Sequence, residues 1–147
     1  MNALVKLADY RPPAYLIPEN ELVDIYVSLD MTATEIHAHY CLGRAAGVPA
    51  ETPLTLYLGA DVVLKHLDVN ESDAVFTREG EVITIADMPE QFNVYVCTIV
   101  NPTANTALSG LYKAGPLLIT QCEAHGFRHI TAWPDRPDVL ASWLVTM

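Results

Sequence analysis

The sequence predicts an all-β fold of the sandwich or barrel type. Apolar and polar residues alternate along much of the first hundred residues, which is the two-residue period of a half-buried strand. Clusters of turn-forming residues interrupt this alternation at intervals of about 8–12 residues. Apolar residues show no sustained helical spacing, and prolines and β-branched residues are scattered through most windows. Short antiparallel strands explain these three observations better than helices do.

The two clearest alternating runs are neighbours in the sequence. In residues 21–30 one face of the expected strand carries Val23, Ile25, Val27 and Leu29. In residues 33–42 the corresponding face carries Ile36, Ala38, Tyr40 and Leu42. The gap between the runs is short, so we expect them to form an antiparallel hairpin.

Further strands are expected at residues 54–58, 62–69, 74–77, 82–86 and 92–100. Turn chemistry separates them at residues 70–73, 78–80 and 87–90. Beyond Val100 the character of the sequence changes.

Residues 101–115 are rich in small and turn-forming residues, and residues 121–137 mix polar groups, aromatics and prolines. We expect an irregular, loop-dominated surface here, which is where binding residues commonly lie. The alternative is merely an irregular edge of the sandwich. Within residues 136–142, Pro137 could open a single helical turn before a final strand.

The composition describes one folded, acidic domain. The chain has 147 residues, of which 51% are hydrophobic and 18% charged, so it is long and apolar enough to bury a core. Eighteen acidic against eight basic residues give a net charge of −10, which argues against a nucleic-acid partner.

The sequence also indicates where the chain resides. No run approaches the roughly 18 apolar residues that span a bilayer, so no membrane partner is expected. The first ten residues lack a basic region, and Lys6 and Asp9 break their apolar stretch, unlike a secretory signal. Three cysteines without CxxC spacing indicate buried thiols in a reducing compartment. We therefore expect a cytoplasmic location.

Two histidine pairs have spacings that could serve a metal. His37 and His39 would project from the same strand face, where Glu35 is the nearest further ligand in sequence. We favour two solvated imidazoles over a metal site, because no complete ligand set is apparent. His125 and His129 have an i, i+4 spacing, but Gly126 disfavours a helix and no HExxH motif is present.

Cys122 and Glu123 are the remaining candidates. A nucleophilic Cys122 would need an activating base and an orienting group, so a buried structural thiol is the better interpretation. Glu123 has small or apolar neighbours, and a partly desolvated carboxylate needs a cation. That cation could be Arg128 within the chain or the ammonium group of a substrate. The sequence pattern alone does not favour either of these two partners for Glu123.

Three segments carry long and unusual motifs. Residues 101–112 read NPTANTAL followed by GLY, and residues 120–140 contain TQCEA, then GFR, then DRPDVL. Residues 10–15 read YRPPAY. These motifs, in this order, resemble the bacterial alanyl aminopeptidase N family, which are zinc metallopeptidases of the M1 group. The resemblance extends from about Asp9 to the end of the chain, with the middle strands matching only in pattern.

The resemblance implies that residues 1–147 form an N-terminal, saddle-like β domain that precedes a thermolysin-like catalytic domain. It implies that Gln121 lines the pocket for the first side chain of a peptide substrate. It also implies that Glu123 binds the free α-ammonium group of that peptide. The expected partners are therefore the N-terminus of a peptide and the chain's own catalytic domain.

The chemistry would belong to the part that this sequence lacks. In the family, zinc is bound by an HExxH motif and a further glutamate, and neither that motif nor the GAMEN-type loop occurs here. We therefore expect no catalytic residue and no metal ligand in the chain, and no activity from it alone. Two alternatives remain: a free-standing β-sandwich that binds a peptide or protein, and a scaffold domain of an inactive M1 relative.

Overall fold

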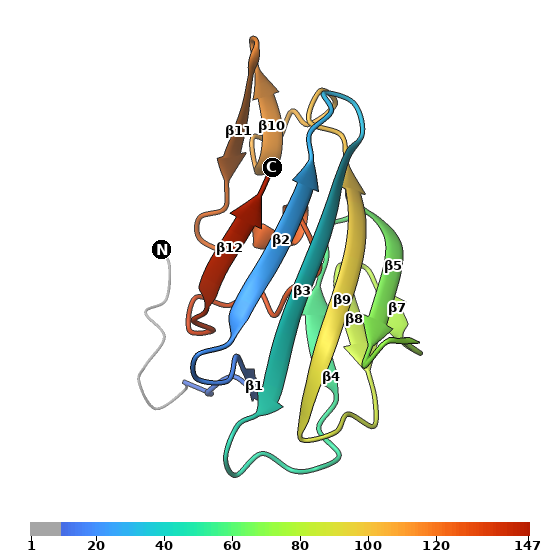
Figure 1. Ribbon diagram of the computed structural model, residues 1–147, viewed down its shortest axis with the longest axis vertical. Coiled ribbons are helices and arrows are strands. Elements are labelled where there is room, and N and C mark those ends of the chain that lie inside the picture. The colour runs from blue at the N-terminus through green and yellow to red at the C-terminus, as the bar shows by residue number, and fades with distance from the viewer. Residues whose placement is uncertain (1–9) are drawn as a thin grey trace.

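The computed structural model describes residues 10–147 and confirms the all-β fold (Figure 1). Its strands are β1 (Tyr15–Leu16), β2 (Leu22–Ser28), β3 (Thr34–Arg44), β4 (Leu54–Tyr57), β5 (Val63–Val69), β6 (Ser72–Asp73), β7 (Thr77–Glu79), β8 (Val82–Ile85), β9 (Gln91–Val100), β10 (Gly110–Ala114), β11 (Leu117–Gln121) and β12 (Ser142–Thr146). A 3₁₀ helix, η2, spans Phe127–His129. In the described part of the chain, no helix is long and apolar enough to cross a membrane.

The strands form three sheets. The largest has seven strands in the order β12-β2-β3-β9-β5-β6, with β1 paired to the end of β3. A three-stranded sheet, β4-β8-β7, lies behind it in Figure 1, and the β10–β11 hairpin stands at the top. All pairs are antiparallel except β12 with β2, which are parallel. None of the three sheets closes into a barrel.

The core fills the space between the two larger sheets. It takes alternate residues from β3, β9, β4 and β8, so the two-residue period of the sequence becomes the inner faces of a two-layer structure. The buried core side chains of these strands include Ile36, Ala38, Tyr40, Leu42, Leu54, Leu56, Ile83, Ile85, Phe92, Val94 and Val96. Each fully buried aliphatic side chain contributes about 1.5–3 kcal/mol.

The hairpin expected over residues 21–42 is confirmed. Strands β2 and β3 pair antiparallel, with Asp24 opposite His39 and Val27 opposite Ile36. Val23 and Ile25 are buried as the alternation predicts. Leu29 is not: it lies past the end of β2 and is 51% exposed, because the chain there begins its turn.

The local expectations are only partly met. Residues 74–76 are not in a strand, although their apolar character predicts one, and Val75 is 90% exposed. Within residues 136–142 the chain makes one turn at Pro137, closed by the Val139 N–H on the Arg136 carbonyl at 3.2 Å, without forming a helix, and the final strand follows as predicted. Conversely, β10 lies within residues 101–115, where the sequence predicts a loop, and it forms a regular hairpin with β11. Its turn depends on Gly115, whose φ of +61° few other residues adopt readily.

Candidate functional site

The two residues singled out for substrate binding lie two positions apart in the chain, at one end of the β10–β11 hairpin. Gln121 is the last residue of β11, and Glu123 follows in a turn. The Gly126 N–H donates to the Cys122 carbonyl across this turn at 2.9 Å. A Cβ at Gly126 would lie 2.8 Å from the Cys122 Cα, so the turn requires glycine. Both Gln121 and Glu123 are exposed.

The NPTANTAL motif builds the loop that leads into this hairpin. The Asn105 side-chain amide donates to the carbonyls of Ser109 at 2.6 Å and Leu111 at 2.9 Å. Its Oδ1 accepts the Ala107 N–H at 3.1 Å. One asparagine thus satisfies three backbone groups around the start of β10. The motif therefore fixes where β10 begins and, through it, where β11 ends.

Gly110 packs directly against His129 of helix η2 and so holds the hairpin close to that helix. It has a φ of +70°, and a Cβ there would lie 2.5 Å from the Cβ and 2.6 Å from the carbonyl oxygen of His129. In the hairpin register, Gly110 lies opposite Gln121. His129 in turn contacts Asp61, with its Nδ1 2.8 Å from the Asp61 Oδ1. The strand end that presents Gln121 is therefore held against the body of the domain.

Arg128 does not pair with Glu123. Its Nε donates to Asp135 Oδ2 at 2.6 Å, and its Nη1 lies 3.4 Å from Glu81 Oε2. The guanidinium also lies over the Tyr57 ring, 4.6 Å from the ring centroid. Within residues 10–147, Glu123 has no hydrogen bond or ion pair. The internal partner that the sequence offered for Glu123 is thus engaged elsewhere.

Cys122 behaves as a structural thiol. It is half-buried, and burial together with the negative charge of Asp135 raises the pKa of its thiol. A raised pKa lowers the population of the nucleophilic thiolate. The side chain lines an apolar cavity of about 290 Å³ between the hairpin and the seven-stranded sheet, with Phe127 and Ile130. The presence of Cys122 is therefore explained by its packing among the apolar residues that line this cavity, and not by a catalytic role.

The structure brings one histidine pair together and separates the other. His37 and His39 share the outer face of β3, as the strand period predicts, and both rings contact Tyr95. His125 is exposed, whereas His129 is half-buried against Asp61. No group of metal-ligating atoms in residues 10–147 includes His125 or His129.

The first and last motifs of the chain meet in space, which the sequence alone did not reveal. Arg136 holds Asp138 by two hydrogen bonds of 2.9 and 2.7 Å and donates to the Arg11 carbonyl at 2.6 Å. The Tyr10 hydroxyl donates to Asp138 at 3.0 Å. The guanidinium of Arg136, outweighing desolvation, lowers the pKa of Asp138 to about 2. These contacts join YRPPAY to DRPDVL.

Sequence comparison now identifies relatives. The chain is 40% identical to aminopeptidase N of Escherichia coli over 134 residues, covering 90% of this chain and 15% of that protein. It is 38% identical to aminopeptidase N of Caulobacter vibrioides over 144 residues, covering 96% of this chain and 16% of that protein. The resemblance to the M1 aminopeptidases is confirmed. No family model matches the sequence.

Solved structures of an aminopeptidase and of an M1 zinc metallopeptidase share the fold. Aminopeptidase A of Legionella pneumophila superposes with a TM-score of 0.78 at 24% identity, over 96% of this chain and 17% of that one. An M1 zinc metallopeptidase of Deinococcus radiodurans gives a TM-score of 0.70 at 12% identity, over 90% of this chain and 32% of that one. The chain thus matches a minor portion of each M1 relative, as expected for one domain of an aminopeptidase.

Proposed function

We propose that the chain is the N-terminal, substrate-binding domain of a zinc-dependent aminopeptidase that removes N-terminal residues from peptides. Glu123 binds the α-ammonium group of the peptide, and Gln121 lines the pocket for its first side chain. The observation that supports this proposal is the unpaired state of Glu123. With Arg128 held by Asp135 and Glu81, no cation in the described residues satisfies this carboxylate.

An unpaired carboxylate on a rigid turn suits the recognition of an ammonium group. The Cys122–Gly126 hydrogen bond and the docked hairpin fix the backbone on both sides of Glu123, so little entropy is lost when a ligand binds. A charge-assisted hydrogen bond in a closed site also rejects peptides whose N-terminus is blocked, because the carboxylate is then left unpaired. Gln121 offers both donor and acceptor atoms beside it.

The hydrolytic step belongs to residues outside this chain. The sequence holds no HExxH motif, and among the described residues no cluster of three or more potential metal ligands includes residues 121–125. Zinc, when bound by the remainder of the enzyme, would polarise the scissile carbonyl and activate water. Residues 1–147 contribute binding and orientation, so the chain alone is expected to be inactive.

The proposed partner domain has a candidate contact surface. Strand β12 is an edge of the seven-stranded sheet, and its apolar side chains are open to solvent. Trp143, Leu144 and Val145 are 43%, 50% and 51% exposed, and nearby Leu140 is 80% exposed. An apolar edge strand of this kind is covered in most stable proteins. We propose that the remainder of the aminopeptidase covers it.

The test is Glu123→Gln in the longest natural protein that contains this chain, assayed on an aminoacyl arylamide. Loss of one charge-assisted contact is worth about 1.5–3 kcal/mol, so kcat/KM should fall about tenfold to 150-fold. KM should rise, and kcat should fall as well if the contact strengthens in the transition state. Glu51→Gln, at an exposed glutamate between β3 and β4, is the matched control and should change neither constant. Unchanged kinetics in Glu123→Gln would remove Glu123 from the site.

Binding without catalysis is the second candidate function. The apolar cavity of about 290 Å³ beside Cys122 favours it, because a free-standing module could hold an apolar side chain there. A natural protein that binds peptides with free N-termini but hydrolyses none would support this alternative against the aminopeptidase.

A further inference from the structure

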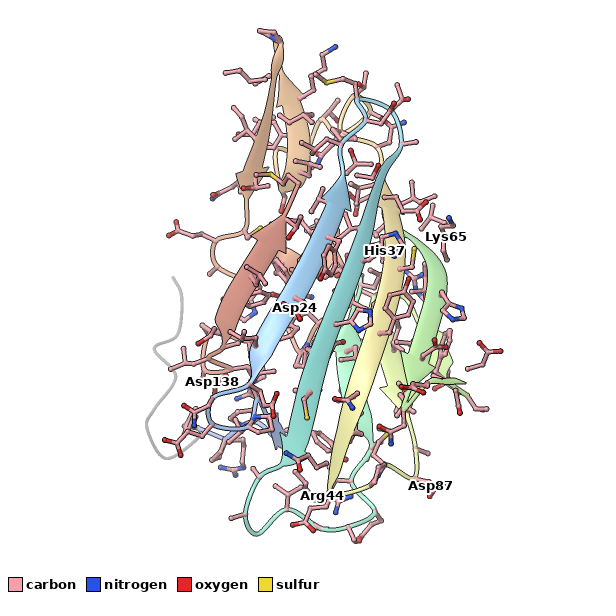
Figure 2. The ribbon with its side chains drawn as sticks, in the orientation of Figure 1. Asp24, His37, Arg44, Lys65, Asp87 and Asp138 are labelled. Atoms are coloured by element: carbon pink, nitrogen blue, oxygen red, sulfur yellow. The ribbon has the colours of Figure 1, made fainter. Side chains whose placement is uncertain are left out.

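The outer face of the seven-stranded sheet carries a cluster of ionisable side chains that the proposed function does not use. This face points away from the three-stranded sheet and towards the viewer in Figure 2, where His37 and Lys65 are labelled. Glu35 and His37 lie two residues apart on β3, and Cys97 on β9 lies directly opposite His37 in the strand register. Three different metal-ligating side chains therefore meet on one sheet surface.

Their donor atoms are close enough to share one ion. The Glu35 Oε1 lies 2.9 Å from the His37 Nε2 and 3.7 Å from the Cys97 Sγ. All three donor atoms lie within 4.8 Å of one another. With zinc–ligand bonds of about 2.0–2.3 Å, tetrahedral ligand atoms are separated by about 3.3–3.6 Å. The observed triangle needs only small side-chain movements to reach this geometry.

We propose that Glu35, His37 and Cys97 form a binding site for a thiophilic divalent cation of the zinc type. Thiolate, imidazole and carboxylate together are a ligand set that zinc prefers over magnesium or calcium. Three protein ligands leave a fourth position for water. Glu35 and His37 are each 33% exposed, so an ion can enter from solvent, whereas Cys97 is buried.

Two neighbours orient the ligands in the way that metal sites require. The Tyr95 hydroxyl lies 2.7 Å from the His37 Nδ1, which directs the other ring nitrogen, Nε2, towards Glu35. Lys65 donates to the Glu35 Oε2 at 2.8 Å, leaving Oε1 for the ion. Lys65 is the residue skipped by the β5–β9 register between Leu64 and His66, and such irregularities redirect side chains. Outer contacts of this kind fix ligand geometry.

A second group of possible ligands lies nearby but is a weaker candidate. His66, Asp68 and Asp73 also have donor atoms within 4.8 Å of one another. They include no thiol, and the Asp73 side chain is 90% exposed. The sequence alone favours solvated imidazoles at His37 and His39, because no residue near them in sequence completes a ligand set. Cys97 supplies the missing ligand from sixty residues away.

The experiment titrates Co²⁺ into the purified 147-residue chain, reduced and stripped with a chelator, and then displaces it with Zn²⁺. We expect one equivalent to bind, with a thiolate-to-cobalt charge-transfer band that Zn²⁺ abolishes. Cys97→Ser should remove the band. Tyr95→Phe should weaken affinity by roughly tenfold to a hundredfold. Cys41→Ser is the matched control, since Cys41 is a half-buried thiol on the same face of β3, and it should retain the band.

Further variants make the result decisive. If circular dichroism shows that Cys97→Ser is unfolded, His37→Gln at a half-exposed position must show the same loss of binding. The proposal is overturned if no charge-transfer band forms, if Cys97→Ser and His37→Gln bind the ion as tightly as the unsubstituted chain, or if Cys41→Ser loses it equally. Loss of binding in His66→Gln with undiminished binding in Cys97→Ser would likewise overturn it, by assigning the ion to the second group.

Discussion

The two candidate functional regions of this domain hold their side chains in place by different means. Glu35, His37 and Cys97 are positioned by the continuous backbone ladder between β3 and β9, which runs from Thr34 opposite Val100 to Gly43 opposite Gln91. The region around Gln121 and Glu123 is a short hairpin and a turn, held by individual side-chain and glycine contacts.

This difference has a consequence for how each region responds to substitution. The positions of residues in a paired sheet change little on most single substitutions, because backbone hydrogen bonds fix the strand register. A loop built on Asn105, Gly110 and Gly126 has no such redundancy. Single substitutions should therefore disturb the hairpin region more than exposed positions of the sheet.

The largest effect is expected for Gly110→Ala. The new Cβ would lie 2.5 Å from the Cβ of His129, and the φ of +70° adds left-handed strain. Overpacking and strain together should cost about 3–5 kcal/mol in the free energy of unfolding, measured by urea denaturation. Gly115→Ala is the control: it has a similar φ of +61° but nothing within 4 Å of its Cβ, so it should cost only about 1–2 kcal/mol. Equal losses would contradict the close contact with His129.

A smaller effect is expected for Asn105→Ala. The substitution removes three hydrogen bonds, to the Ser109 and Leu111 carbonyls and from the Ala107 N–H, and it should destabilise the domain by about 2–3 kcal/mol. Asn101→Ala removes a single bond, from the Ala104 N–H at 3.0 Å, and should cost about 1 kcal/mol. Thermal unfolding of the two variants compares them. If Asn101→Ala proves the more damaging, the NPTANTAL loop is not organised by Asn105.

The smallest effect tests the contact between the two ends of the chain. The pKa of Asp138 is about 2 in the folded state, below its usual value, so its stabilisation is present above about pH 4 and is lost as the pH falls through 2. Asp138→Asn should lower the free energy of unfolding by about 1 kcal/mol at pH 7, after allowance for solvent screening, and by progressively less as the pH falls towards and below 2. In an Arg136→Gln background the same substitution should have little effect at pH 7. A pH-independent loss would show that the ion pair is not the cause.

Much of the large sheet could be predicted from local pattern. The alternation in residues 21–30 and 33–42 reports which side chains face the core, and the structure buries Ile25 and Ile36 accordingly. Residues 74–76 show the limit of this reasoning. Their apolar side chains suggest a strand, but they connect β6 and β7, which belong to different sheets. Local hydrophobicity does not reveal such a change of partner.

Other features depend on contacts between distant residues. The hairpin of β10 and β11 carries a local signal in Gly115-Pro116, which the abundance of small residues in this segment obscured. The parallel pairing of β12 with β2 carries none, because the two strands are more than a hundred residues apart. The same holds for Cys97 beside His37, and for Arg128, whose engagement by Asp135 and Glu81 decides what Glu123 is free to bind.

The central claim is that Glu123 binds an α-ammonium group, and a crystal structure of the longer natural protein with a bound amino acid tests it most directly. We predict a Glu123 carboxylate oxygen about 2.7–2.9 Å from the ammonium nitrogen, with Arg128 still held by Asp135. A structure in which Glu123 pairs with a cation of the protein itself, and the ammonium group lies beyond hydrogen-bond distance, would contradict the claim.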